Sequence, residues 1–266
     1  KWISQPIYVA AELGIADLVD EGPKSVAELA SATDSHPDSL YRMMRALASV
    51  GIFSENEGQR FALTPMAECL KEDGMRSIAL LFNSPWSERA WEYLKDNVAT
   101  GTTAFELAHG MPVAQWLEHN PDAAQIFNDA NAVKTAGFQR SILDAYDFSG
   151  ISTLTDIGGG RGGLVAEILL AYPGMKGVLA ERPSVAKEGY ETILSKGLEK
   201  RCRVLDCDFF KEVPGGSDIY LMLNILHDWS DKQCRIILAN CKKAMSPEAK
   251  LLIIEMMVTT GGRERT

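Results

Sequence analysis

A run of glycines and the acidic residue after it have the types and spacing of a nucleoside-binding site. Residues 158–163 read GGGRGG after a short apolar segment, and Glu181 follows Gly158 by 23 positions. Glycine lacks a Cβ, so this run can turn sharply and let a ligand approach the backbone. A carboxylate at the end of the next strand can accept hydrogen bonds from both ribose hydroxyls. Gly158, Gly160 and Gly163 also satisfy G-x-G-x-x-G, so a nicotinamide dinucleotide stays open as the ligand.

The surrounding elements predict an α/β domain with a doubly wound parallel sheet. Short apolar segments, typical of buried parallel strands, alternate with helices. The expected strands are 153–157, 178–180, 203–205, 218–223 and 250–254, and the helices after Glu181 are 185–194 and 231–245. Polar residues lie at the carboxyl ends of these strands: Asp156, Glu181, Asp208, Asn224 with His227, and Glu255. Since α/β sheets bind ligands at that edge, these side chains form the candidate site.

Composition limits the classes of protein to consider. A formal net charge of −9 disfavours a nucleic-acid or anionic-membrane partner. No apolar stretch is long enough to span a bilayer, and no secretory signal is visible. The five cysteines show no C-x-x-C pairing, which favours free thiols in a reducing cytoplasm. Because the first residue is Lys1, we expect a longer protein in which a targeting segment could precede this chain.

Residues 1–70 have the pattern of a winged helix-turn-helix. The expected elements are a helix over 7–19, a short helix with Ser25 and Glu28 as its capping box, a helix over 37–50, and a hairpin of strands 52–53 and 60–63. Such a motif usually binds DNA, but this segment has five lysines and arginines against ten aspartates and glutamates, a net charge of −5. We instead expect apolar residues of the first helix to contact a second chain: Trp2, Ile3, Ile7 and Tyr8.

Residues 71–148 are expected to be wholly helical, with helices starting near Pro85, Pro112 and Pro121. Their aromatic residues are more often core than ligand contacts, although they are also candidates for a substrate lid: Trp86, Trp91, Phe105, Trp116 and Phe127. The domains expected are therefore 1–70, a helical connector over 71–148, and the α/β domain over 149–266.

With these motifs in place, the chain resembles the S-adenosylmethionine-dependent O-methyltransferases of the plant caffeate and animal hydroxyindole type, including bacterial relatives that act on polyketide and phenazine-like aromatics. The resemblance covers nearly the whole chain and is carried by TDIGGGRGG, DFF, LHDWSD and the closing GGRERT. It implies a Rossmann-like class I methyltransferase sheet with an N-terminal, mainly helical winged-helix dimerisation domain. It also implies a homodimer with S-adenosylmethionine as cofactor and a small aromatic hydroxyl compound as substrate.

The resemblance assigns cofactor contacts to Gly158, Gly160, Glu181, Asp208, Phe209 and Asn224. The glycines would line the methionyl and ribose portion, and Glu181, where most relatives have Asp, would hold the ribose hydroxyls. Asp208 would accept from the adenine amino group while Phe209 packs against the ring. Cys207 stands where relatives usually have Gly, and Asn224 where they often have a basic or aromatic residue.

By the same resemblance, His227 is the general base, and Glu255 and Glu264 are the acidic residues that flank it. A histidine titrates near ~pH 6.5 and can deprotonate a phenol around neutral pH. A carboxylate on its other ring nitrogen would hold the tautomer and stabilise the imidazolium. Phe127, Asn131 and Lys134 fall on substrate-lining positions. Plant members tend to have Met and His at the last two, so a phenylpropanoid would not be recognised in the same way.

Glu255 and Glu264 are only nine positions apart, whereas in relatives a helix and a loop intervene. We therefore expect a missing segment between Val258 and Thr259, and the chain stops at Thr266 before the family's last strands. The alternatives are an NAD(P)-dependent oxidoreductase and a non-catalytic winged-helix regulator that binds DNA. A metal-assisted methyltransferase is a lesser variant. Asp206 and Asp208 could ligate magnesium, but no third ligand is evident, and we predict no metal.

Overall fold

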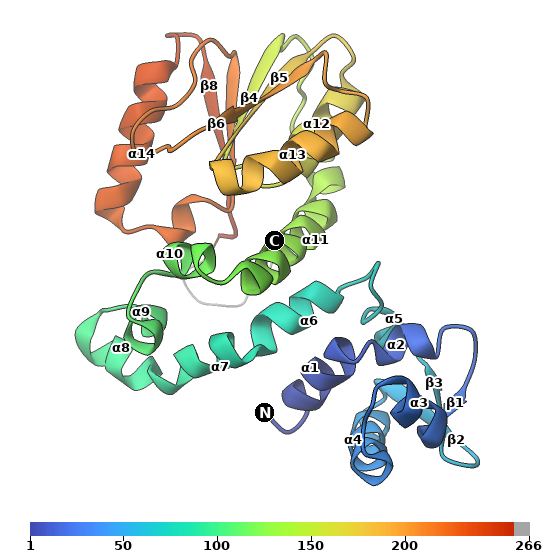
Figure 1. Cartoon of the computed structure of the whole chain (residues 1–266). Helices are drawn as coiled ribbons and strands as arrows, with labels where there is room; N and C mark the ends of the chain where they lie inside the picture. Colours follow the sequence, from blue (N-terminus) through green and yellow to red (C-terminus); the bar gives the residue numbers. More distant parts are fainter. Residues whose placement is uncertain (258–266) are drawn as a thin grey trace. The chain divides into compact units, whose positions relative to one another are not determined.

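A computed structural model of the chain describes residues 1–257 (Figure 1). The contacts between residues divide the chain into two units, the first over Lys1–Val133 and the second from Lys134 onward. One long helix, α11 (Pro121–Ala145), contains the point of division.

The first part of unit 1 is a small helical bundle with a three-stranded sheet. Its helices are α1 (Ser4–Glu12), α2 (Ile15–Leu18), α3 (Val26–Ala32) and α4 (Pro37–Ser49), and its strands pair antiparallel in the order β1 (Lys24–Ser25), β3 (Arg60–Leu63), β2 (Phe53–Asn56). Helix α4 and strand β3 confirm the sequence prediction, whereas the first strand of the hairpin, expected over 52–53, runs over Phe53–Asn56. The capping box is also confirmed: the Ser25 amide donates to Glu28 Oε2 at 2.7 Å and the Glu28 amide donates to Ser25 Oγ at 3.3 Å.

Two features of this part differ from the prediction. The single helix expected over 7–19 is wrong, because Gly14 adopts a left-handed backbone conformation with φ 64° and separates α1 from α2. A Cβ on Gly14 would lie 3.3 Å from a guanidinium nitrogen of Arg76, so the break also brings the chain close to that side chain. Strand β1 was not predicted, since two residues carry no alternating pattern. Of the apolar residues expected to contact a second chain, Trp2 precedes α1 and is 94% exposed, whereas Ile3 and Ile7 are partly buried against the core of this part.

The rest of unit 1 is helical, as predicted. Its helices are α5 (Pro65–Glu68), α6 (Arg76–Asn83), α7 (Pro85–Glu92), α8 (Leu94–Thr100), α9 (Ala104–His109), α10 (Val113–Glu118) and the beginning of α11. Trp86, Phe105 and Trp116 form one aromatic cluster with His109, with ring centroids 4.3–6.2 Å apart. The expectation of a core position is wrong for Trp91, which is 61% exposed.

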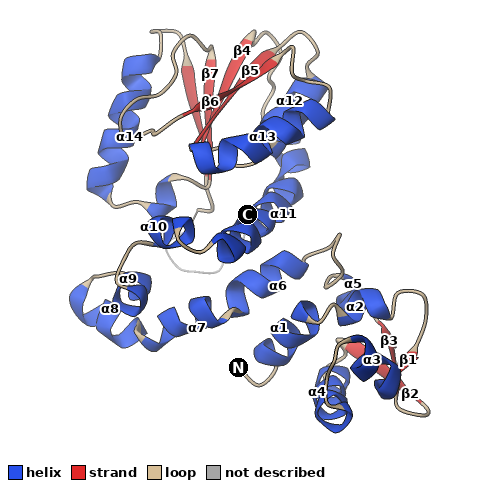
Figure 2. Ribbon diagram, viewed as in Figure 1, coloured by secondary structure: helices blue, strands red, loops and turns tan. Residues whose placement is uncertain are grey.

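Unit 2 contains a parallel sheet of five strands in the order β6-β5-β4-β7-β8. The strands are β4 (Thr153–Ile157), β5 (Lys176–Glu181), β6 (Cys202–Asp206), β7 (Ile219–Leu223) and β8 (Lys250–Ile254). Helices α12 (Gly163–Ala171) and α13 (Pro183–Ser195) cover one face of the sheet, and α14 (Asp231–Ala244) covers the other (Figure 2). The direction of winding reverses between β4 and β7, and a crevice at the carboxyl ends of the strands is expected at such a point.

Both faces of this sheet are buried, which explains the nearly continuous apolar strands in the sequence. Leu154, Leu179 and Leu221 lie in one core with residues of α12. Tyr220 and Met222 lie in the second core with residues of α14. At the opposite edge from the candidate site, the Asp218 carboxylate accepts hydrogen bonds from the Ser152 and Thr153 amides at 2.9 and 2.8 Å and so connects β7 to β4.

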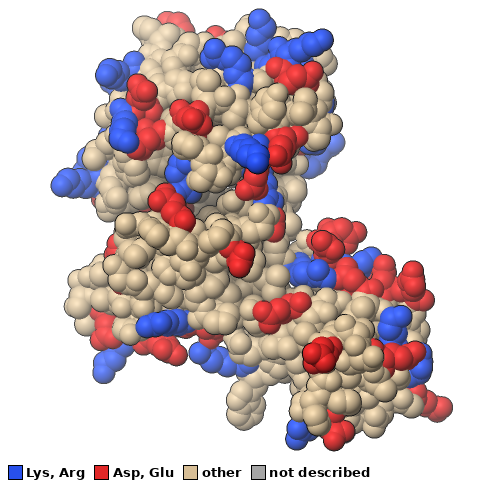
Figure 3. Space-filling view, in the orientation of Figure 1, with Lys and Arg blue, Asp and Glu red and all other residues tan. Residues whose placement is uncertain are grey.

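Lysine and arginine side chains alternate with aspartate and glutamate over the face drawn in Figure 3. All five cysteines have free thiols. Among the helices of residues 1–257, none is long and apolar enough to cross a membrane.

Candidate functional site

The turn between β4 and α12 is built from glycines in conformations that other residues rarely adopt. Gly158, Gly160 and Gly162 have φ of 68°, 58° and 73°. The Gly158 amide donates to the Ala180 carbonyl at 2.8 Å, which fixes the turn to β5. A Cβ on Gly158 would lie 2.6 Å from Ile225 Cδ1, whereas one on Gly160 would meet nothing within 4 Å. The backbone at Gly160 is therefore open to a ligand.

Glu181 ends β5 beside this turn and is only 8% exposed. Its Oε2 accepts a hydrogen bond from the Gly160 amide at 2.9 Å, and its Oε1 accepts one from the Arg182 amide at 2.7 Å. Each carboxylate oxygen can accept more than one hydrogen bond. Glu181 can therefore keep the turn in place and still accept hydrogen bonds from the hydroxyls of a ligand.

Asp208 and Phe209 follow β6 at the same edge of the sheet. Asp208 accepts from the Phe210 amide at 3.1 Å and forms an ion pair with Lys211 at 2.9 Å, and this lysine is the main cause that lowers the pKa of Asp208. The Phe209 ring passes 3.6 Å from the place of a Cβ on Gly158, and its centroid is 6.0 Å from that of Trp229. An apolar wall thus stands next to the glycine turn, and Asp208 immediately precedes Phe209 in the chain.

His227 lies in a short 3₁₀ turn (η1, Leu226–Asp228) and is held by Glu255, which follows β8. His227 Nδ1 is 2.6 Å from Glu255 Oε2, while Glu255 Oε1 accepts from the Ile225 and Leu226 amides at 3.0 and 2.8 Å. Burial alone would raise the pKa of Glu255, but the hydrogen bonds from His227 and Leu226 outweigh it and lower that pKa. Since an ionised carboxylate only accepts, Nδ1 must carry the proton of this bond. In neutral imidazole this leaves Nε2 as the basic nitrogen.

Asp228 and Lys134 place two further charges at this end of unit 2. Asp228 Oδ1 is 3.4 Å from His227 Nε2. Desolvation raises the pKa of Asp228, although His227 and Lys134 act in the opposite direction. Desolvation lowers the pKa of Lys134, and the charge of Asp228 partly offsets that effect. The ammonium group is therefore partly withdrawn from water near the imidazole's acidic neighbour.

Phe127, Asn131 and Lys134 are half-buried on α11. They are spaced by four and then three residues, so they share one face of that helix.

Asn224, which directly follows β7, has a left-handed backbone with φ 54°, and its backbone amide donates to the Ile254 carbonyl at 3.0 Å. Glu264 and the junction between Val258 and Thr259 lie outside the described residues. Asp206 and Asp208 do not join a third His, Cys, Asp or Glu in a metal-binding group within residues 1–257.

Comparison with known proteins gives the family. A profile of the O-methyltransferase domain matches residues 91–266, and a profile of the O-methyltransferase dimerisation domain matches residues 1–73. The phenazine O-methyltransferase PhzM of Lysobacter antibioticus is 40% identical over 263 residues, which cover 98% of this chain and 77% of the relative. The chain belongs to the O-methyltransferase family.

Solved structures agree with this assignment. The crystal structure of LaPhzM matches the methyltransferase with a TM-score of 0.95 at 40% identity and covers 99% of this chain and 80% of that one. The structure of NcsB1 from neocarzinostatin biosynthesis, in complex with S-adenosylmethionine and 2-hydroxy-5-methyl naphthoic acid, has a TM-score of 0.85 at 29% identity and covers 96% and 80%. The methyltransferase therefore uses S-adenosylmethionine. The nicotinamide oxidoreductase and the non-catalytic regulator are set aside.

The sequence places Asp156 at the sheet edge without giving it a role, and Asp228 is absent from the sequence-based site assignments. Asp228 stands directly after His227 and is the D of HDW, so its position alone could have pointed to it. Asp156 is 1% exposed, and neither of its carboxylate oxygens has a hydrogen-bond partner among the described residues. Burial, and then the charge of Glu181, raise the pKa of Asp156 to about 7. Only the folded structure shows that isolation.

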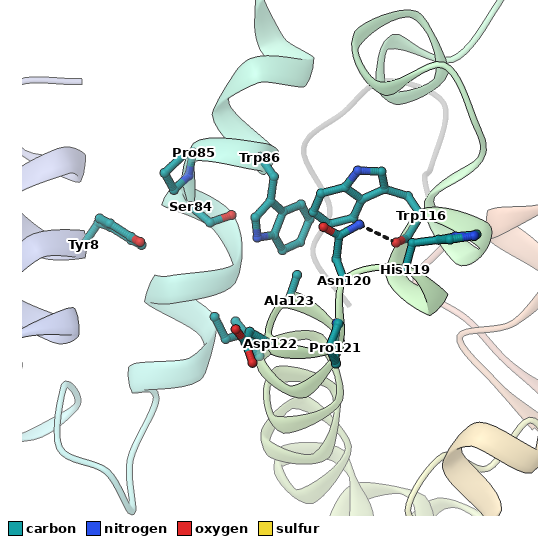
Figure 4. A pocket seen from close by; sticks show the side chains of 11 residues that line it. Tyr8, Ser84, Pro85, Trp86, Trp116, His119, Asn120, Pro121, Asp122 and Ala123 are labelled. Carbon is teal, nitrogen blue, oxygen red and sulfur yellow. Dashed lines mark hydrogen bonds between the residues drawn. The ribbon is translucent and has the colours of Figure 1, made fainter.

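The methyltransferase also has a pocket of about 340 Å³ in unit 1 (Figure 4). The rings of Trp86 and Trp116 lie beside each other in it, with centroids 5.4 Å apart, and Asn120 donates to the Trp116 carbonyl at 2.7 Å. Tyr8 of α1 and Asp122 of α11 also line it.

We expect Asp156→Asn to stabilise the methyltransferase at pH 8. The folded-state pKa of Asp156 is raised, so its favourable contribution is complete below the ordinary pKa near ~3.9 and is lost as pH rises towards about 7. The amide removes the buried charge, and we expect a melting temperature higher by ~3–6 °C at pH 8, with a smaller gain at pH 5. Calorimetry at both values checks this. No gain at pH 8 would mean that Asp156 is ionised and paired in the folded protein.

We expect Glu255→Gln to lower the free energy of unfolding by ~1–2 kcal/mol at pH 7, because charge-assisted hydrogen bonds become neutral ones. The pKa of Glu255 is lowered in the folded state. Its contribution is therefore present above the ordinary value near ~4.3 and lost as pH falls through the folded-state pKa. Urea unfolding at pH 7 and pH 4 should show the difference from wild type shrinking at the lower pH. Glu248→Gln, at an exposed position, is the control. A constant difference would contradict the ionised Glu255.

Proposed function

We propose that the chain transfers the methyl group of S-adenosylmethionine to a hydroxyl of a small aromatic acceptor, with His227 as the general base. The observation that carries the proposal is the 2.6 Å bond between His227 Nδ1 and Glu255, which leaves Nε2 as the basic atom. Ile225, two residues before His227, abuts Gly158 in the glycine turn. The base and the turn are therefore neighbours at one sheet edge.

The residues around the glycine turn fit an adenosyl cofactor. Gly160 leaves open space at the backbone, Glu181 offers carboxylate oxygens for ribose hydroxyls, and Phe209 supplies an apolar wall for adenine. Asp208 would accept from the adenine amino group, and Asn224 would contribute from the end of the β7 segment. When bound, the cofactor supplies a sulfonium-activated methyl group. The protein has only to align the acceptor oxygen and remove one proton.

The proton has a defined route. As the acceptor oxygen takes the methyl group, its O–H bond breaks and the proton passes to Nε2 of His227. Glu255 stabilises the resulting imidazolium through Nδ1, and Asp228, 3.4 Å from Nε2, adds a second negative charge. Glu264 is proposed as the second flanking acid.

We place the acceptor against Phe127, Asn131 and Lys134, which share one face of α11. The relative PhzM is named a phenazine O-methyltransferase, and the NcsB1 structure holds 2-hydroxy-5-methyl naphthoic acid, which favours a planar aromatic acceptor. We also propose a homodimer formed through the dimerisation domain, and a cytoplasmic location, where the five free thiols would stay reduced.

Methylation of a ring nitrogen is the competing activity. Phenazine-1-carboxylate N-methyltransferase of Pseudomonas aeruginosa is 32% identical over 97% of this chain. A pyridine-type nitrogen has no proton to lose, so its methylation needs no general base. The dependence of the rate on His227 therefore separates the two activities.

We expect His227→Ala to lower kcat by ~10²–10⁴ with a hydroxylated phenazine or a hydroxynaphthoic acid as acceptor, because the proton loses its acceptor. Transfer of a labelled methyl group measures the rate, and mass spectrometry with NMR locates the methyl on oxygen. Affinity for S-adenosylhomocysteine should stay within about threefold. His36→Ala, at an exposed position, should retain full activity. An unchanged rate, or a methyl group on nitrogen, would contradict the proposal.

We expect Lys134→Met to discriminate between acceptors by their charge. The partly desolvated Lys134 would be stabilised by an anionic group on the acceptor. The KM of an acceptor with a carboxylate beside its hydroxyl should rise by ~10-fold or more, whereas the KM of its uncharged analogue should change less than ~3-fold. Steady-state kinetics with the matched pair measures this. Equal effects on both acceptors would leave Lys134 without a role in charge recognition.

A further inference from the structure

Leu179 is a fully buried side chain surrounded by three glycines that belong to two different segments. A Cβ on Gly159 would lie 2.4 Å from Asp156 Oδ2 and 2.7 Å from Leu179 Cδ1, and one on Gly162 would lie 2.8 Å from Leu179 Cδ2. Gly189, inside α13, is closer still, because its Cβ would lie 2.5 Å from Cδ2. Real side chains do not approach so closely. The two methyl groups of Leu179 therefore occupy space that only glycines leave free.

Leu179 stands two residues before Glu181, so both side chains lie on the same face of β5. Gly177 occupies the same face two residues earlier, and a Cβ there would lie 3.0 Å from Val165 of α12. Along this face, Gly177 admits α12, Leu179 fills the inside of the glycine turn, and Glu181 accepts from the Gly160 amide. These three residues on one face of β5 thus contact α12 and the glycine turn.

We propose that Leu179 is a positioning residue for the cofactor, which sets the glycine turn in its binding conformation through contact with Gly159, Gly162 and Gly189. The inference rests on the proposed placement of the cofactor over this turn. It adds a fully buried residue that lies outside the GGGRGG motif.

The physical reason is the freedom of glycine. A chain with several consecutive glycines has many backbone conformations of similar energy, and binding would have to select one of them. Close packing around a rigid, buried side chain removes the alternatives before the ligand arrives. The turn is then preorganised, and the cost of ordering it does not reduce the affinity. Leu179 acts in this way from the protein side, while the open face of the turn at Gly160 stays free.

The first test compares Leu179→Ala with Leu154→Ala. Leu154 is also fully buried, but it lies at the start of β4, away from the turn. Calorimetric titration with S-adenosylhomocysteine should show Kd raised by ~10-fold or more for Leu179→Ala and less than ~2-fold for Leu154→Ala, at a comparable loss of melting temperature. In kinetics, the KM for S-adenosylmethionine should rise by a similar factor while kcat at saturation stays within ~3-fold. Equal changes in Kd for both variants would overturn the proposal.

The second test uses a coupled pair that keeps the core filled. Gly189→Ala places a methyl group against Leu179 and within 3.4 Å of the Gly160 carbonyl, and it should weaken binding by ~10-fold. Leu179→Val removes the δ-carbons that this methyl meets, so the double variant should recover at least half of that loss on a logarithmic scale. Additive effects would show that the two residues do not act through one contact.

A third variant separates this inference from the proposed function. Glu181→Gln reports on the cofactor's placement and should weaken S-adenosylhomocysteine binding whether or not Leu179 matters. If Glu181→Gln weakens binding and the Leu179 variants do not, the placement stands and the positioning role is wrong. If none of these variants changes Kd while the wild type binds, the placement itself is wrong, and the inference falls with it.

Discussion

The close approach of the glycine turn to its neighbours is the constraint on which the site depends. A Cβ on Gly158 would lie 2.6 Å from Ile225 Cδ1, and Cβ atoms on Gly159 and Gly162 would lie 2.7 and 2.8 Å from the δ-carbons of Leu179, so any side chain here would force those neighbours to shift. Through the first contact the turn meets the segment that carries His227, and through the second it meets the strand that carries Glu181. The two halves of the proposed site therefore share a single packing interface. Dispersion contacts and excluded volume act there together with the hydrogen bonds of the Gly158 and Gly160 amides to Ala180 and Glu181.

Electrostatics adds a second layer of organisation at the same edge. Asp156, Glu181, Glu255 and Asp228 are all acidic, although they differ in surroundings. Glu255 is satisfied by three donors and has a lowered pKa, whereas Asp156 has no hydrogen-bond partner among the described residues and a raised one. A cationic sulfonium donor fits a site of this sign. Glu255 is thus an ionised carboxylate that orients the base, whereas burial disfavours the ionised form of Asp156.

Much of this arrangement could be predicted from the sequence, because the signals are local. The five strands of unit 2, the capping box at Ser25 and the helices after Pro85 and Pro121 follow from periodicity, capping residues and proline positions. The break at Gly14 was missed because an isolated glycine in an apolar helical pattern does not reveal its φ. Strand β1 was missed because its two residues become a strand only by pairing with β3. These are tertiary effects without a local signature.

The candidate site likewise has features that local motifs predict and features that depend on tertiary packing. Motifs placed His227, Glu255, Glu181 and the glycines at one edge of the sheet, since parallel strands bring their carboxyl ends together. Motifs could not show that Asp156 is 1% exposed with a raised pKa, or that Asp228 lies 3.4 Å from Nε2 of the base, because both facts depend on how the surrounding backbone packs.

The importance of Leu179 was hidden for a related reason. A leucine in a buried strand is the commonest of core residues, and nothing in its neighbours along the chain distinguishes it from Leu154 or Leu221. Its role arises from where three glycines, 159, 162 and 189, converge, and the first two belong to the GGGRGG run. The same glycines that admit a cofactor on one side admit a side chain on the other. A glycine motif in such a sheet therefore reflects the packing of the neighbouring strand as well as the binding of a ligand.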